Sequence, residues 1–315
     1  MARLNRWQIA LIIALAIPAG FTAVTVWRAS QAAHDSAAQL ASESQMRFTV
    51  TRLDHPVPPA IEWISAPAVF RDVALFQGRI YISGPAGLME YDTGGALRTH
   101  YRPGLELPAA PLGGMAVGTA ADSSGRELFI ATSGEGLLAF DGSHFRQIRA
   151  VDAADRRLTA VLPLGDGRVL LGTESQGVLA YDGKRLTAFH SSLDALHVTA
   201  LAGDGTDLWV GTLDRGVYHW HAGQVDRVSE GQGLPDPQVL SLAVNEDVAF
   251  AGTPMGIAEF RNGHFTRVLA HGFFANALLL WSEGLAAGSL DEGVVKIPFT
   301  DAPARSARPH TYPLA

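Results

Sequence analysis

The chain has 315 residues, of which 47% are hydrophobic and 17% charged, a balance that fits a packed core and excludes a generally disordered chain. The net charge is −7 without a concentrated basic segment, which argues against a nucleic-acid partner. The absence of cysteine excludes disulfides, thiolate catalysis and Cys-ligated zinc.

The N-terminal segment, residues 1–28, predicts a membrane anchor. Arg3 and Arg6 precede an uncharged run that ends before Arg28, and its 19 residues from 9 to 27 would span about 28 Å as a helix, close to the hydrocarbon thickness. Because more positive charge precedes the run than follows it, we expect a cytoplasmic N-terminus. The rest of the chain would then lie in the periplasm or another extracytoplasmic space. A cleaved signal peptide is the alternative.

Composition suggests three further divisions of the chain. Residues 29–45 are rich in Ala, Ser and Gln and indicate a spacer that holds the following domain off the membrane. Residues 46–300 carry the repeats, and residues 301–315 form a proline-rich tail. We therefore expect a single-pass inner-membrane protein with one large extracytoplasmic domain.

One short pattern recurs six times. Each copy has a pair of small residues, a few turn residues, a glycine and an alternating apolar strand, as in GTESQGVLAY from Gly172. The turn glycines are Gly87, Gly136, Gly177, Gly216, Gly256 and Gly293. Their spacings of 49, 41, 39, 40 and 37 residues predict an all-β fold, a β-propeller with one blade per repeat.

The fourth repeat illustrates the four strands expected in each blade, which are residues 198–202, 207–212, 216–220 and 224–228. Short hairpins of type I′ are expected between third and fourth strands, because Asp-Gly and Asn-Gly pairs favour the positive φ that this turn needs at both central residues. The pairs are Asp141–Gly142, Asp182–Gly183 and Asn262–Gly263.

The sixth repeat lacks a fourth strand, because Pro298 follows its third strand and the tail is rich in proline. Residues 47–53 (RFTVTRL) alternate like the fourth strand of another repeat, residues 264–268. We therefore expect a six-bladed propeller in which residues 47–53 complete the last blade and close the ring, removing an exposed sheet edge. A seven-bladed ring is the alternative.

Three segments resemble the two-component regulator propeller repeat: GLPDPQVLSL at residues 233–242, LWVGT at 208–212 and GVY at 216–218. The resemblance covers residues 70–297 and implies the extracytoplasmic sensor region of a membrane histidine kinase or related regulator. This chain departs from the family because only the fourth repeat keeps the tryptophan, Trp209. It also shows no kinase, receiver or DNA-binding domain, so we expect another protein to carry any signal onward.

Propellers usually bind ligands where the loops between second and third strands, and between blades, surround one mouth of the channel. Those loops supply a polar, net acidic rim that could bind a small ligand, a cation or a basic partner. The alternative is that these are ordinary solvated turn residues. The candidate ligand-binding residues are Glu135, Glu174, Gln176, His197, Asp214, Arg215, His271, Asp291 and Glu292.

Histidines elsewhere are weaker candidates. His219 and His221 share a strand face and could ligate Zn²⁺ or Cu²⁺, but no third ligand is evident, so we interpret them as exposed strand residues. His264 and His271 resemble the acid–base histidine of propeller lyases such as streptogramin lyases, but neither has an evident partner. We expect neither a metal nor another cofactor.

The insertion at residues 102–114 (RPGLELPAAPLGG) is expected to be a loop between the first two blades. It could form a lip over the channel, a docking loop or tolerated surface.

Together these features predict a membrane-tethered propeller that binds a small ligand or an envelope protein as a sensor or scaffold. The alternative is a lyase or hydrolase acting on a small molecule or polysaccharide at the channel mouth.

Overall fold

The computed structural model describes residues 27–28, 70–120, 125–150, 156–184, 186–246, 248–281, 284–290 and 292–299. The chain divides into a first unit, residues 1–62, and a second unit, residues 63–315. In the first unit only Trp27 and Arg28 are described, and both are helical. The rest of the expected anchor and the spacer therefore lie outside the described residues. Within the described ranges, no helix has the length and apolar character needed to cross a membrane.

The second unit is an all-β, six-bladed β-propeller, and each blade is an antiparallel meander in sequence order. The first three blades are β1 (Asp72–Phe76), β2 (Arg79–Gly84), β3 (Gly87–Asp92) and β4 (Leu97–Tyr101); β5 (Leu112–Thr119), β6 (Arg126–Thr132), β7 (Gly136–Phe140) and β8 (Phe145–Ile148); and β9 (Leu158–Pro163), β10 (Val169–Thr173), β11 (Val178–Tyr181) and β12 (Leu186–Ala188).

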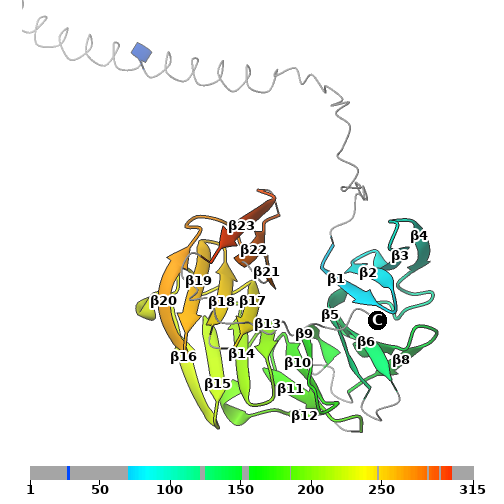
Figure 1. Cartoon of the computed structure of the whole chain (residues 1–315). Coiled ribbons are helices and arrows are strands. Elements are labelled where there is room, and N and C mark those ends of the chain that lie inside the picture. The colour runs from blue at the N-terminus through cyan, green and yellow to red at the C-terminus, as the bar shows by residue number, and fades with distance from the viewer. Residues whose placement is uncertain are drawn as a thin grey trace, which may run out of the picture. The chain divides into compact units, whose positions relative to one another are not determined.

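The last three blades follow the same order and include two short 3₁₀ helices in the connections between blades (Figure 1). They are β13 (Val198–Gly203), β14 (Asp207–Thr212), β15 (Val217–His221) and β16 (Gln224–Val228); β17 (Ser241–Asn245), β18 (Val248–Thr253), β19 (Gly256–Arg261) and β20 (His264–Leu269); and β21 (Ala277–Trp281), β22 (Gly284–Gly288) and β23 (Val294–Pro298), with η2 (Ser191–Leu193) and η3 (Glu230–Gln232).

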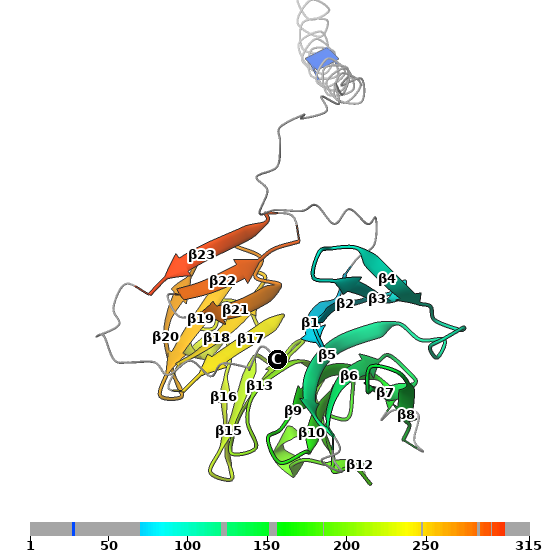
Figure 2. The ribbon, with the colours of Figure 1, turned by 45° about the vertical axis from the view of Figure 1, so that its right-hand side comes forward.

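The core consists of apolar layers between consecutive blades. In the described residues, five clusters of buried side chains each join one blade to the next, from the first blade to the sixth. The second strand of a blade is covered on both faces, which explains continuous apolar runs such as Leu170–Leu171 in β10. Figure 2 shows the blades arranged around a common axis, with the innermost strands β5, β9, β13 and β17 side by side.

A buried threonine holds the turn between the second and third strands. In the fourth blade, Oγ1 of Thr212 donates to the carbonyl of Gly216 at 2.7 Å and accepts from the N–H of Arg215 at 3.0 Å. Thr132, Thr173 and Thr253 make the same pair of bonds. Both hydrogen-bonding roles of each hydroxyl are used inside the protein, so the Gly-Thr pairs of the repeat serve the fold.

The recurring glycine follows this threonine for a steric reason. Gly177 has a φ of 75°, and a Cβ added there would lie 1.8 Å from the carbonyl oxygen of Leu193. A side chain is therefore excluded both by the positive φ and by the backbone of the next connection. The glycine spacing found in the sequence thus marks one structural position in each blade.

The strand boundaries predicted for the fourth repeat agree with β13 to β16 to within one residue. The type I′ turn is confirmed at Asn262–Gly263, where both residues have positive φ. It is wrong at Asp141–Gly142 and Asp182–Gly183, where only the glycine has positive φ. There the aspartate Oδ1 accepts a backbone N–H two residues on, and this local bond favours a different turn.

The insertion at residues 102–114 is partly core. Leu107 and Leu112 are buried in the layer between the first two blades, and Leu112 begins β5. Arg102 pairs with Glu106 at 3.0 Å across the surface part of the segment. The closing strand expected at residues 47–53 and the tail at 301–315 lie outside the described residues. In the described part of blade six, β23 is the last strand of a three-stranded sheet.

Candidate functional site

A pocket of about 240 Å³ lies between the fourth and fifth blades. It is at the end of the propeller where first strands turn into second strands and third strands turn into fourth strands, opposite the loops of the predicted rim. Its lining residues are Asp207, Trp209, His219, His221, Asp226, Glu246, Val248, Ala249, Asn262, Gly263 and His264.

The register of the fourth blade explains why its five lining residues share one face. Asp207 and Trp209 alternate along β14, and they pair directly with His221 and His219 of β15, respectively. His219 in turn pairs with Asp226 of β16. Because side chains at alternate positions point the same way, all five project from the face of the blade toward blade five.

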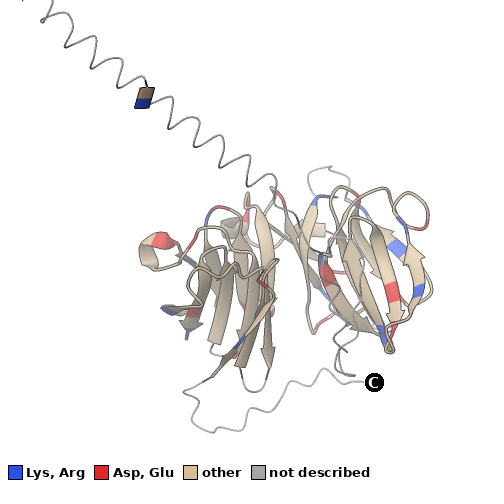
Figure 3. Ribbon diagram, turned by 90° about the horizontal axis from the view of Figure 1, so that it is seen from above, with Lys and Arg blue, Asp and Glu red and all other residues tan. Residues whose placement is uncertain are grey.

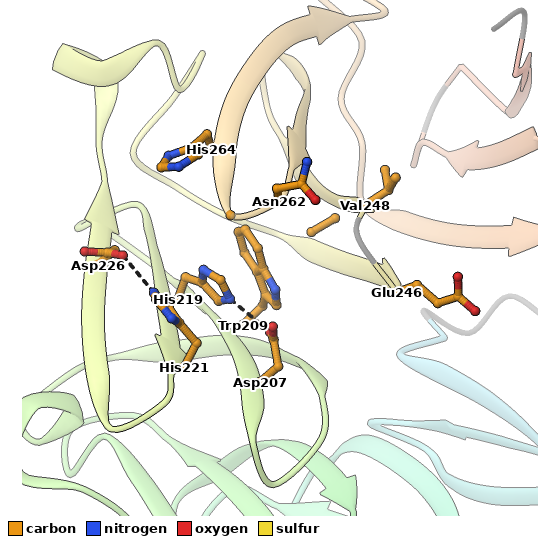
Figure 4. Close-up of a pocket in the computed structure, with 11 residues that line it drawn as sticks. Asp207, Trp209, His219, His221, Asp226, Glu246, Val248, Asn262 and His264 are labelled. Carbon is orange, nitrogen blue, oxygen red and sulfur yellow. Dashed lines mark hydrogen bonds and ion pairs between the residues drawn. The ribbon is translucent and has the colours of Figure 1, made fainter. Parts of the chain in front are cut away.

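Two histidine–aspartate pairs run diagonally across this face (Figure 4). Nε2 of His219 lies 2.9 Å from Oδ1 of Asp207, and Nε2 of His221 lies 2.9 Å from Oδ2 of Asp226. With each Nε2 donating to a carboxylate, the second nitrogen of each ring, Nδ1, is left as an acceptor while the imidazole is neutral.

His219 is the buried member of the group. Its side chain is only 7% exposed, and its ring stacks on Trp209 with centroids 4.0 Å apart. Nδ1 of His219 is one of three buried side-chain atoms without a hydrogen-bond partner among the described residues. A neutral polar group buried in this way costs about 1–3 kcal/mol. The fold therefore carries an unsatisfied acceptor in the wall of its pocket.

Burial also sets the protonation of this face. Desolvation lowers the pKa of His219 below its ordinary value of 6.5, against the opposing effect of Asp207. The hydrogen bond from His221 lowers the pKa of Asp226. At neutral pH the site therefore contains a neutral His219 and an ionised Asp226.

Blade five supplies the opposite wall. The turn at Asn262–Gly263 approaches the unsatisfied edge of His219 so closely that a Cβ on Gly263 would lie 3.2 Å from both Nδ1 and Cε1 of that ring. Both turn residues have positive φ, at 49° and 80°. Glycine is thus required here by backbone conformation and by the imidazole beneath it. His264 follows the turn and Glu246 lies across the pocket (Figure 4).

Charge in this pocket differs from charge elsewhere on the propeller. Figure 3 shows acidic and basic positions interleaved over the blades, and several acids pair with arginine, as Glu127 does with Arg146 at 2.8 Å. Glu259 is buried at the strand position of blade five that is equivalent to His219 in blade four, and it binds both Arg261 and Arg267. In contrast, the eleven lining residues of the pocket include three carboxylates and neither lysine nor arginine.

The described residues of the predicted rim lie at the other end of the blades and are spread over blades two to six. Glu135 accepts from Gln147 and Arg149, and Glu174 accepts from Ser133 at 2.9 Å and Arg157 at 3.4 Å. These bonds link turns rather than converge on a cavity. Gln176, Asp214, Arg215, His271 and Glu292 are exposed, His197 is half-buried, and Asp291 lies outside the described residues.

The expectation that His219 and His221 are exposed is wrong for His219, although the two do share a face as their spacing predicts. The sequence could have indicated His219 if the same position had been compared across the six repeats. The residue three after the turn glycine is Glu90, Ala139, Ala180, His219, Glu259 and Lys296 in successive blades. A single histidine there, with the single Trp209 opposite it on the second strand, marks blade four as different. Among the described residues, no group of three or more His, Asp or Glu is placed to hold a metal ion.

Comparison with models of known protein families gives no match, and neither does comparison with curated proteins. Solved structures share the fold. The extracellular domain of the one-component system BT4673 from B. thetaiotaomicron is 15% identical with a TM-score of 0.56, over 72% of this chain and 32% of that chain. The chain thus spans about a third of the length of that extracellular domain.

Two further structures are similar at the level of the fold. A catalytically inactive H270A form of virginiamycin B lyase from Staphylococcus aureus, determined with quinupristin, is 8% identical with a TM-score of 0.56, over 76% of this chain and 87% of that chain. The computationally designed Ika8 protein is 15% identical with a TM-score of 0.54, over 73% of this chain and 70% of that chain. At these identities the similarity concerns the propeller architecture alone.

Proposed function

We propose that this protein is a ligand-binding propeller whose ligand occupies the pocket between blades four and five. The observation that carries the proposal is the unpartnered Nδ1 of His219 in the wall of that pocket. A protein that needed only stability at this position would place an apolar ring on Trp209, because an unsatisfied buried acceptor is destabilising. A bound molecule with a hydrogen-bond donor removes that cost.

The experiment is a thermal-shift screen of the full-length protein in detergent against a panel of small metabolites and glycans. A compound that binds the folded state raises the melting temperature by an amount that grows with the logarithm of its concentration above Kd. His219→Phe should abolish the shift. The control is His144→Phe, because His144 is an exposed histidine in the turn between β7 and β8 and does not line the pocket. A shift that survives in His219→Phe would place the ligand elsewhere, and no shift from any compound would count against the proposal.

The second candidate is a lyase or hydrolase. The pair formed by Asp207 and His219 favours it, since a carboxylate that orients a neutral imidazole is a common general-base arrangement. No serine or threonine lines the pocket among the described residues, so such chemistry would need the base to act on the substrate itself. Mass spectrometry of a bound compound after long incubation separates the two, because a binding module returns it unchanged.

The role as an extracytoplasmic sensor or scaffold extends this proposal. We infer that residues 9–27 anchor the chain and that the propeller faces outward, which the arginine distribution of the N-terminus supports. A partner in the envelope would then receive the signal, as the resemblance to two-component regulator propellers implies. Resistance to alkaline extraction, with protease access to the propeller only from outside the membrane, tests this topology. Extraction of the full-length chain as a soluble protein would overturn it.

A further inference from the structure

The chemistry of the pocket indicates what kind of molecule it accepts. Asp207, Asp226 and Glu246 place three carboxylates on its lining, and the eleven lining residues contain no permanent cation. Carboxylates gathered at a surface are not in themselves a site. Here they share the lining with the buried His219, whose unpartnered Nδ1 is a second and independent sign of a missing donor.

The hydrogen-bonding inventory of the pocket points in the same direction. The ring N–H groups of His219 and His221 are directed to Asp207 and Asp226, so these donors are already used. What remains available on these residues is acceptor capacity, namely Nδ1 of the neutral His219 and the free lone pairs of two carboxylates. An anionic ligand would meet repulsion and few donors, whereas a ligand rich in N–H groups would meet complementary acceptors.

Blade five offers an internal comparison for the same geometry. Its Glu259 occupies the strand position equivalent to His219, and this buried carboxylate is satisfied by the guanidinium groups of Arg261 and Arg267. Blade four has acids around its equivalent position but no arginine in the lining. In blade five the arginines of the chain itself provide the positive charge, whereas the lining of the pocket on blade four has no such residue.

We propose that the ligand is a small organic cation, a primary amine or guanidinium compound, held by Asp207, Asp226 and Glu246 with an N–H donated to His219. This inference rests on the ligand-binding function proposed for the same pocket. The volume of about 240 Å³ limits the buried part to a small amine or to the cationic end of a longer molecule. The neutral state of His219 is required, because a protonated Nδ1 would be a donor that faces the ligand's own N–H.

The test uses isothermal titration of the full-length protein in detergent near neutral pH. The probes are 1,4-diaminobutane and agmatine, with 1,4-butanediol and succinate as neutral and anionic probes of similar length, and Zn²⁺ as a metal probe. Binding of a diamine or of agmatine is expected, with neither butanediol nor succinate binding. Asp207→Asn and Asp226→Asn should each weaken amine binding about tenfold or more, since each removes a charged acceptor.

Two further variants make the assignment specific. His219→Phe keeps an aromatic ring on Trp209 but has no hydrogen-bond acceptor, so it should weaken amine binding while preserving the fold. Asp166→Asn is the control. Asp166 lies in the turn between β9 and β10 of blade three, at the same end of the propeller as the pocket. It pairs with Arg168 and does not line the pocket. The affinity of this variant for the amine should equal that of the unmodified protein.

The outcomes separate this inference from the function on which it rests. Binding of butanediol, succinate or Zn²⁺ instead of the amines, with loss of that binding in His219→Phe, would overturn the ligand class while leaving the pocket as a binding site. Amine binding that is equally weakened by Asp166→Asn would reveal nonspecific attraction to an acidic protein and would also overturn the proposal. Absence of binding by every probe, together with a failed thermal-shift screen, would remove both.

Discussion

Trp209 and His219 lie face to face, with ring centroids 4.0 Å apart and planes 17° from parallel. The pair arises directly from the sheet register, because the two residues are opposite each other on β14 and β15. Trp209 also belongs to the apolar layer between blades four and five, where it packs near Phe260. One residue thus links the packing of two blades to the orientation of the imidazole in the pocket.

Trp209→Ala should lower the free energy of unfolding by about 3–5 kcal/mol, as removal of a fully buried aromatic side chain leaves a cavity. Trp209→Phe should lose much less, since a ring still covers His219. Guanidinium denaturation of the full-length protein, followed by circular dichroism, measures both. A loss in Trp209→Ala of under about 1 kcal/mol would mean that the blade interface collapses into the cavity and that this layer is more plastic than its burial indicates.

His219→Phe should leave stability unchanged or raise it, even though it removes the hydrogen bond to Asp207. The substitution eliminates the unsatisfied Nδ1, which costs about 1–3 kcal/mol, and keeps an aromatic ring on Trp209. Asp207 is half exposed and can be solvated by water. The same denaturation assay checks this, and a marked loss of stability would show that the imidazole has a structural role instead of a binding one.

Stability should depend on pH through His219. Its folded pKa is lowered by burial, so between 6.5 and that lower value the unfolded chain binds a proton that the folded chain does not. Stability therefore falls as pH falls below 6.5 and stops falling from this cause below the folded pKa. The groups around the ring are Asp207, Asp226 and His221 on its own blade, and Glu246 and His264 on blade five.

Melting temperatures across this pH range, compared between the unmodified protein and His219→Phe, isolate that contribution. The variant should show a shallower decline below pH 6.5, because one depressed histidine is gone. Parallel curves would indicate that His219 keeps its ordinary pKa. Amine binding should weaken only when the pH falls to the lowered folded pKa, since protonation of the folded protein then converts the Nδ1 acceptor into a donor.

The propeller itself could be predicted from the sequence because each blade repeats the same local chemistry. The turn glycine occurs at a fixed position in all six repeats and the buried threonine in four of them, so the glycine spacing alone reveals the blades. The pocket could not be found in this way. It depends on the diagonal contacts of Asp207, His219, His221 and Asp226 and on the turn that blade five brings against them, and no spacing within one repeat indicates which neighbour covers which face.

The predicted rim shows a second limit of prediction from sequence, because the positions were predicted correctly but the side-chain contacts could not be. Residues such as Glu135 and Glu174 lie at one end of the blades, as loop positions require, but sequence does not show whether loop side chains converge or pair locally. The structure gives them arginine and amide partners on adjacent turns. An acidic side chain in a turn is thus a weak indicator of a site, whereas a residue type that occurs once at a repeated strand position, as His219 does, is a better one.

Thr212→Val should destabilise the propeller by about 1–3 kcal/mol, because it leaves the N–H of Arg215 without its side-chain partner and leaves the carbonyl of Gly216 with only the backbone N–H of residue 212 as donor. Thr212→Ser retains the hydroxyl and should cost less. Comparison of the two denaturation midpoints separates the hydrogen bonds from the methyl group. Equal losses in both variants would show that the methyl packing, not the hydroxyl, holds this turn.

Closure of the ring by residues 47–53 remains a proposal, and exposed apolar side chains on the first and sixth blades support it. Val73 of β1 is 63% exposed, and Leu279 of β21 and Val294 of β23 are 66% and 71% exposed. In the described residues the sheet of Leu279 and Val294 ends at three strands, and exposed apolar side chains on such a sheet are an aggregation risk unless another segment covers them.

The absence of native cysteine allows a direct test of this closure by disulfide cross-linking. Thr49→Cys is combined in turn with a cysteine at each position of β23, from 294 to 298. If residues 47–53 pair with β23, one register should bring the two Cβ atoms within the roughly 3.5–4.5 Å that a disulfide requires, so one pair should form in high yield under mild oxidation. Because neighbouring positions point to opposite faces, the adjacent pairs should react poorly. Equal, low yields at all five positions, or a preference for cysteines placed on β1, would contradict pairing with the sixth blade.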